Sequence, residues 1–141
     1  LGLHDTMQFY AAPCLGSSAV LKAVDHAWLD GFYAIQESFY DTTDPAQVEY
    51  GEKYNDDYAA YPDNTVRGYT KIAYLLIHGL ETAEDPTNPE SVKSALEAIN
   101  GYSTIFGTVS CDENHSFVRE VVLTKWNADT DSLDLVTAIG E

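Results

Sequence analysis

The residues that could carry chemistry are few and lie far apart in the chain. The two cysteines, Cys14 and Cys111, have no histidine at a spacing that would pair it with either thiol for nucleophilic catalysis. The four histidines do not show the short spacings of metal ligands, and the chain has no glycine-rich phosphate-binding loop. We therefore expect no enzymatic activity, no cofactor and no metal site.

Two aspartates near the C-terminus have part of the pattern of a calcium-binding loop. Asp129 and Asp131 have the alternating spacing of that loop, but Asp134 and Gly140 stand where its glycine and its final glutamate belong. This departure favours a hairpin turn. The two cysteines leave two interpretations open, because they could pair in an oxidising compartment or remain small apolar residues with free thiols.

Composition excludes several classes of partner. The 141 residues carry 7 basic and 23 acidic side chains, a net charge of -16, whereas nucleic acids and anionic membranes require clustered lysine and arginine. Hydrophobic residues make up 45% of the chain, which is typical of one globular domain or a piece of a larger protein. The chain opens without a methionine or a basic signal-peptide region, and residues 1–5 resemble the end of a helix, so we expect an internal fragment.

One long helix, expected between Asp63 and Ala83, is the element that would position a site. Asp63 or Asn64 can accept hydrogen bonds from the free N–H groups of its first turn. Apolar residues recur along it at three- and four-residue steps and so share one face: Val66, Tyr69, Ile72, Ala73, Leu76, Ile77 and Leu80. Because so apolar a helix is not stable alone in water, other segments must cover it.

The remaining elements follow from turn residues and from hydrophobic periodicity. Strands are expected at Thr6–Ala11, Phe32–Phe39, Ile105–Cys111, Phe117–Trp126 and Leu133–Ile139. Further helices are expected from Ser17 or Ser18 to Leu29, after Asp44-Pro45 and after Asn88-Pro89. The order is that of a mixed α/β chain, with strand, helix, strand, three helices and an antiparallel β-meander. Three successive helices have few strands to lie on, which indicates missing partners.

The ordered series of motifs resembles the C-terminal part of type I periplasmic binding proteins, the leucine/isoleucine/valine-binding-protein-like solute receptors of ABC transporters. The resemblance covers nearly the whole chain and is carried by Pro45, Tyr54, Tyr58, Pro62, Gly68-Tyr69, residues 73–76, Gly79-Leu80, Ala83, residues 88–96 and residues 106–114. Cys111 stands where the family usually has phenylalanine, and His115 stands near the position of its turn glycine.

The resemblance implies two α/β lobes with a solute in the cleft between them. Residues 1–40 would be part of the second lobe, residues 41–104 would be helices of the first lobe, and residues 105–141 would be the hinge and closing strands. By the same resemblance, the ligand-binding residues would be Ala12, Pro13 and Cys14 in the loop after the first strand, and Asn64 and Thr65 at the start of the long helix. The loop at residues 12–15 has no acidic residue for an amino-acid ammonium group.

The function implied is that of a periplasmic or extracellular solute-binding component of an ABC transporter, for branched-chain amino acids or related small polar solutes. Its partners would be the solute, the membrane permease and the rest of the receptor chain, and the fragment alone could dimerise to cover its apolar helix. Two alternatives stay open. One is a ligand-sensing ectodomain of a signalling receptor with the same fold. The other is a free-standing acidic interaction domain that uses its stripe of tyrosines, Tyr50, Tyr54, Tyr58 and Tyr61.

Overall fold

A computed structural model describes residues 6–139, and the helix end expected at residues 1–5 lies outside them. The N-terminal part contains two short strands with three short helical segments between them. In chain order these are β1 (Tyr10–Ala11), η2 (Pro13–Gly16), α1 (Ser18–Leu21), η3 (His26–Leu29) and β2 (Tyr33–Gln36). The order of strand, helix and strand is confirmed.

The single helix expected up to Leu29 is wrong, because the chain breaks between α1 and η3. Asp25 has extended backbone angles, and its carboxylate accepts a hydrogen bond from the N–H of Ala27 at 3.1 Å. This local bond starts a new 3₁₀ turn instead of continuing the helix. The expected first strand is also shorter in the structure, where only Tyr10 and Ala11 pair, in parallel with Tyr33 and Ala34 of β2.

The three predicted helices of the middle region are present. They are α2 (Pro45–Tyr58), α3 (Asn64–Thr82) and α4 (Pro89–Glu97). Each begins with a side chain that accepts a hydrogen bond from the first turn, at Asp44, Asp63 and Asn88 as the sequence predicts. Within residues 6–139, none of the helices combines the length and hydrophobicity needed to cross a bilayer.

The C-terminal strands pair antiparallel as β3–β4, β4–β5 and β6–β7, but they divide between two sheets. One sheet consists of β3 (Tyr102–Thr104), β4 (Gly107–Cys111) and β5 (Phe117–Arg119). The others, β6 (Val121–Asn127) and β7 (Ser132–Ile139), extend the first sheet in the order β1-β2-β6-β7. The strand expected from Phe117 to Trp126 is therefore broken at Glu120, where the chain passes from one sheet to the other.

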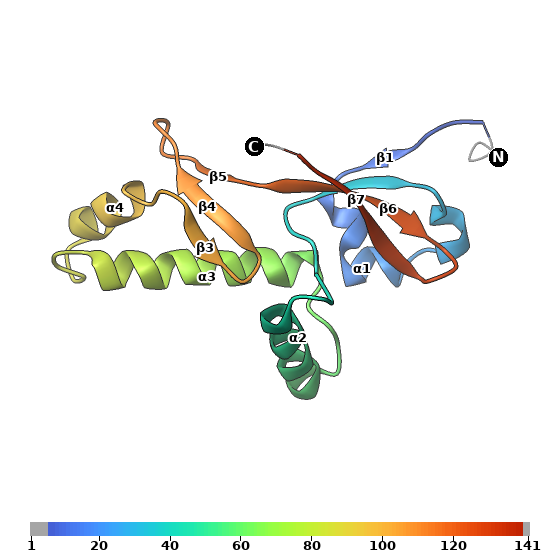
Figure 1. The fold of residues 1–141 in the computed structure, drawn as a ribbon, viewed down its shortest axis with the longest axis horizontal. Coiled ribbons are helices and arrows are strands. Elements are labelled where there is room, and N and C mark those ends of the chain that lie inside the picture. The colour runs from blue at the N-terminus through green and yellow to red at the C-terminus, as the bar shows by residue number, and fades with distance from the viewer. Residues whose placement is uncertain (1–5, 140–141) are drawn as a thin grey trace.

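Two hydrophobic clusters lie within residues 6–139, one in each part of the molecule. The first is centred on Leu15, Leu29, Ala34 and Trp126 in the four-stranded sheet and its helical turns. The second, centred on Leu75, Ile99 and Val109, joins α3 to α4 and the three-stranded sheet. Figure 1 shows the two parts side by side, connected by the β5–β6 ribbon, with α2 projecting from their junction.

The apolar face of α3 is largely uncovered. Its exposed apolar residues, which have exposed fractions of 47–69%, are Tyr69, Ile72, Leu76, Ile77 and Leu80. The opposite stripe is the buried one and consists of Asn64, Arg67, Lys71, Leu75 and Gly79. A compact monomer of this mass would expose about 7,200 Å², whereas the chain exposes 9163 Å². The structure therefore leaves open the face that the sequence predicts must be covered.

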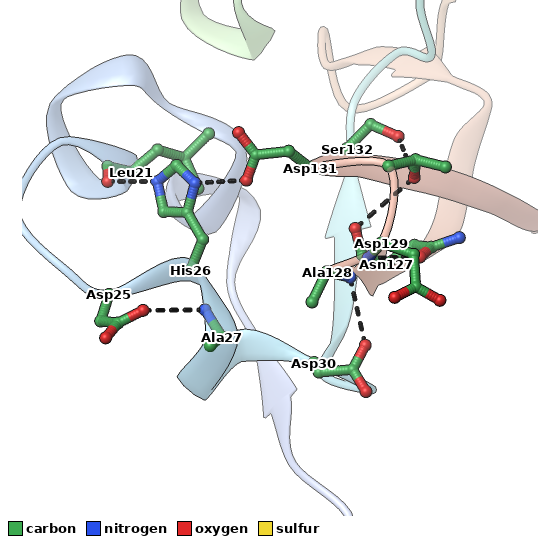
Figure 2. A network of polar contacts seen from close by, with 11 residues as sticks. Leu21, Asp25, His26, Ala27, Asp30, Asn127, Ala128, Asp129, Asp131 and Ser132 are labelled. Carbon is green, nitrogen blue, oxygen red and sulfur yellow. Dashed lines mark hydrogen bonds and ion pairs between the residues drawn. The ribbon is translucent and has the colours of Figure 1, made fainter.

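A polar network joins η3 to the hairpin between β6 and β7, as Figure 2 shows. The Nδ1 of His26 lies 2.5 Å from Asp131 Oδ1, and its Nε2 lies 2.6 Å from the carbonyl of Leu21. Both neighbours accept hydrogen bonds, so the two ring nitrogens can satisfy them together only when both carry protons. The backbone N–H of Ala128 donates to Asp30 Oδ1 at 3.2 Å. Asp131 thus belongs to a hairpin turn, as the sequence predicts.

Gly51 in α2 leaves room for the ring of Tyr40. A Cβ added at Gly51 would lie 1.9 Å from the Tyr40 hydroxyl oxygen and 2.7 Å from Cζ. At Gly68 in α3 the nearest atom would be 3.7 Å away.

We expect Gly51→Ala to lower the free energy of unfolding by about 1–3 kcal/mol through overpacking. Gly68→Ala should be neutral or raise that free energy by up to about 1 kcal/mol. Denaturant unfolding of both variants tests this, and equal effects at the two sites would contradict it.

The His26 network predicts a pH dependence of stability. The pKa of His26 is raised, chiefly by its hydrogen bond to the Leu21 carbonyl and then by its bond to Asp131. Because the folded-state pKa is raised, the stabilisation is complete below about pH 6.5 and is lost as pH rises through the folded-state value. We expect the melting temperature of wild type, relative to His26→Gln, to fall between pH 5.5 and pH 8. In Asp131→Asn this trend should be weaker but still present, and parallel curves for wild type and His26→Gln would contradict the assignment.

Candidate ligand-binding site

A cavity of about 760 Å³ opens beside the N-terminal half of α3. Its walls come from η2, the segment after β2, α3 and the β4–β5 hairpin. The lining residues are Pro13, Cys14, Glu37, Asn64, Thr65, Gly68, Tyr69, Lys71, Ile72, Leu75, Val109, Ser116, Phe117 and Arg119. These elements meet near the junction of the two parts of the molecule (Figure 1). Segments more than 100 residues apart in sequence therefore share one concave surface.

Four of the five ligand-binding residues expected from the sequence line this cavity. Pro13 and Cys14 enter from η2, and Asn64 and Thr65 from the first turn of α3. Ala12 does not line it. That residue is exposed and precedes η2, where its carbonyl accepts a hydrogen bond from the N–H of Leu15 at 3.1 Å. The structure thus places η2 and the first turn of α3, which are about 50 residues apart in sequence, beside the same cavity.

Asn64 places an amide at the cavity wall. Asp63 caps the helix by accepting from the N–H of Val66 at 3.0 Å, which leaves the Asn64 side chain free of the capping role. Asn64 is only 7% exposed, and its Oδ1 has no hydrogen-bond partner among the described residues. A buried amide oxygen without a partner carries a desolvation cost that a bound donor could remove.

Three charged side chains line the cavity. An Nη2 of Arg119 lies 2.6 Å from Oε1 of Glu37, and both side chains are about one-third exposed. The Nζ of Lys71 donates to the backbone carbonyl of Glu37. Lys71 is 4% exposed. Burial lowers the pKa of Lys71 to about 8. The positive charge of Arg119 acts in the same direction, and the negative charge of Glu37 opposes it.

Arg67 lies one turn before Lys71 on the same buried stripe and fixes the start of α3. Its Nη1 donates to the carbonyl of Pro62 at 2.7 Å. Its Nε and Nη2 donate to the hydroxyl and the carbonyl of Ser38 at 3.2 and 3.3 Å. Burial lowers its pKa to about 10, and it stays charged at neutral pH. The guanidinium therefore attaches α3 to the backbone that follows β2 and holds this wall of the cavity in place.

Sequence reasoning missed Glu37, Lys71 and Arg119. A signal for Lys71 exists, since Asn64, Arg67 and Lys71 recur at three- and four-residue steps and form a polar stripe on an otherwise apolar helix. Such a stripe indicates a helix side that faces polar groups. Glu37 and Arg119 lie at strand ends, and nothing local in the sequence distinguishes them from surface charges.

The remaining wall is apolar and includes Ile72, Leu75, Val109 and Phe117. A few fixed polar groups beside an apolar surface are characteristic of small-molecule sites. Among residues 6–139, no group of three or more His, Cys, Asp or Glu side chains is arranged to hold a metal ion. Cys14 and Cys111 are both free thiols. The arrangement can hold a small molecule that has a charged or polar end and an apolar body.

Comparison with known proteins identifies a family and a fold. A model of the periplasmic binding protein family matches residues 1–131. A search of curated protein sequences found no significant match. The leucine-binding protein LivK of Thermotoga maritima has a similar structure, with a TM-score of 0.78, 17% identity, and alignment over 97% of this chain and 38% of LivK.

Two further structures show the same fold. The isoleucine complex of the branched-chain amino acid binding protein LivJ of Streptococcus pneumoniae gives a TM-score of 0.76 at 12% identity, over 96% of this chain and 38% of LivJ. The benzoate complex of an ABC transporter solute-binding protein of R. palustris gives 0.73 at 16% identity, over 94% and 36%. The chain therefore spans less than two-fifths of the length of each of these proteins and has part of the type I periplasmic binding fold.

The two arginines of the chain should differ sharply in their effect on stability. Arg67→Met leaves the buried carbonyls of Ser38 and Pro62 without a donor, so we expect a loss of about 2–4 kcal/mol in the free energy of unfolding. Arg119→Met removes a partly exposed ion pair and should cost less than about 1 kcal/mol. Equilibrium unfolding in urea measures both, and a cost for Arg67→Met no larger than that for Arg119→Met would contradict the attachment role of Arg67.

Proposed function

Because this chain belongs to the periplasmic binding protein family, we propose that it is part of the extracytoplasmic solute-binding component of an ABC transporter. Its solute would be a branched-chain amino acid or a related small polar molecule, and its membrane partner would be the transporter's permease. The protein would bind and release the solute without covalent change. The single observation that carries the proposal is the cavity at the start of α3, where Asn64, Thr65 and three charged side chains adjoin an apolar wall.

The ligands of the similar proteins support this range of solutes. One is a leucine-binding protein, one holds isoleucine and one holds benzoate. Each of these ligands combines a carboxylate with an apolar body, which suits the polar and apolar walls of the cavity. The loop at residues 12–15 has no acid, and the carboxylate that lines this cavity, that of Glu37, already pairs with Arg119.

We further propose that the part of the uncovered face of α3 beyond the cavity, which consists of Leu76, Ile77 and Leu80, packs against another part of the receptor chain. Residues 1–40 would belong to the second lobe, residues 41–104 would supply helices of the first lobe, and residues 105–141 would form the hinge and closing strands. Two observations support this division. The two hydrophobic clusters are separate, and the apolar face of α3 is exposed along its length.

A thermal-shift screen of the complete receptor tests the proposed function. We expect leucine, isoleucine, valine or benzoate to raise its melting temperature, since a ligand at 100 times its Kd stabilises by about 2.7 kcal/mol. Thr65→Val should weaken binding about 3- to 10-fold by removing a hydroxyl from the cavity. Thr82→Val, at the far end of α3, should not change binding. No stabilisation by amino acids, amides, short carboxylates or aromatic acids would count against a solute-binding role.

A further inference from the structure

Lys71 is the charged group of the cavity with the fewest partners. It is 4% exposed, and its Nζ donates to one acceptor, the backbone carbonyl of Glu37. An ammonium group has three donors, so two remain for another partner. Among residues 6–139, no ion pair involves Lys71. Binding of an anion stabilises a buried cation that has no counter-charge.

The charged groups around Lys71 either have other partners or face solvent. In the cavity, the charge of Arg119 is met by Glu37 at 2.6 Å. On its other side, Lys71 borders a smaller cavity of about 190 Å³ that Asp41 and Glu120 also line. The carboxylate of Asp41 accepts from the N–H and hydroxyl of Thr43 at 2.8 and 2.6 Å. Glu120 is exposed to solvent. The main cavity therefore holds two cations and one carboxylate, a net charge of one positive.

We propose that Lys71 is the group that binds the carboxylate of the solute. This inference rests on the proposed function, which it deepens by naming the solute class and the residue that selects it. The solute enters with its carboxylate toward the two free donors of Lys71, and its remaining atoms lie against the apolar wall.

The charge count and the walls define the solute class. One net positive charge is neutralised by a monoanion, whereas a phosphate dianion would leave an excess buried negative charge. Ile72, Leu75, Val109 and Phe117 suit an apolar body. An α-ammonium group is not required, because the loop at residues 12–15 has no acid and Glu37 is engaged by Arg119. The class is therefore small apolar monocarboxylates. An α-amino acid presents the same carboxylate to Lys71, but its ammonium group cancels that charge and leaves the cavity with its net positive charge.

Carboxylate binding at this position is coupled to proton uptake. The groups that face Lys71 are Glu37 after β2, Arg67 on α3, Arg119 on β5 and Glu120 after it. In the free protein the pKa of Lys71 lies at about 8, so much of the group is neutral at pH 9. A bound carboxylate raises the pKa of Lys71, so at pH 9 Lys71 takes up about one proton for each solute bound. Below about pH 7 the group is already charged, and uptake vanishes.

Matched acids and amides provide the test on the complete receptor. We expect leucine, 4-methylpentanoate and benzoate to bind about 10- to 100-fold more tightly than leucinamide, 4-methylpentanamide and benzamide, because an amide leaves the ammonium without a counter-charge. Lys71→Met should remove this preference. Lys93→Met loses an exposed helical lysine of the same charge, and should retain the preference.

Calorimetry of wild type provides a second readout that needs no variant. Titration with 4-methylpentanoate or benzoate in two buffers of different ionisation enthalpy gives the number of protons taken up at pH 6.5 and at pH 9. We expect uptake only at pH 9, only for acids and not in Lys71→Met. Equal affinities of acids and amides, or no proton uptake at pH 9, would overturn the assignment while leaving a solute-binding role intact. Failure of every solute to bind would overturn the proposed function and this inference together.

Discussion

Buried cations bonded to neutral backbone carbonyls hold the two parts of this molecule together. Arg67 donates to the hydroxyl and the carbonyl of Ser38, and Lys71 donates to the carbonyl of Glu37, so α3 is attached to the segment directly after β2. Removing these cations from water is costly, and charge-assisted hydrogen bonds offset the cost only while their geometry is maintained. The relative position of the two hydrophobic clusters therefore depends on directional bonds. Lys71 and Glu37 also line the cavity, so the shape of the cavity depends on their bond too.

This attachment explains why α3, within the described residues, buries a mostly polar side and exposes an apolar one. Its buried stripe is mostly polar or small, while its apolar stripe faces outward. A surface helix of a complete globular domain buries its apolar side and exposes its polar side. The two stripes are consistent with two different neighbours, a polar segment that this chain supplies at residues 37–38 and an apolar surface that α3 does not find among residues 6–139. The excess of exposed area over that of a compact monomer has the same origin.

Local chemistry made three of the four expected helices predictable, whereas the division of the strands between two sheets depends on long-range contacts. Asp44, Asp63 and Asn88 mark helix starts because each cap bonds a backbone group two or three residues away. Strand membership instead depends on partners far along the chain. The segment from Phe117 to Trp126 carries the charged pair Arg119-Glu120 at the break, and its two halves pair with different sheets. Charged residues also occur inside strands, as Lys125 does in β6, so this pair alone does not predict the break at Glu120.

The same distinction applies to the site. Pro13, Cys14, Asn64 and Thr65 were expected from a family resemblance that fixes which loops approach one another. Glu37, Lys71 and Arg119 meet only in three dimensions, and the bond from Lys71 to Glu37 spans 34 residues. The sequence shows the polar stripe on α3, but it does not show that this stripe bonds to Glu37 and Ser38. Tertiary packing decides which charges are buried, and burial is what lowers the pKa of Lys71.

A net charge of -16 and an anionic solute are compatible, because distance and dielectric separate the two effects. A carboxylate about 4 Å from a partly buried ammonium gains about 4 kcal/mol at an effective dielectric constant near 20. A surface carboxylate about 16 Å away repels it by about 0.3 kcal/mol in water, before screening by salt with a Debye length of about 8 Å. The local cation therefore determines affinity. The acidic surface acts on the approach of the solute, where it slows association most at low ionic strength.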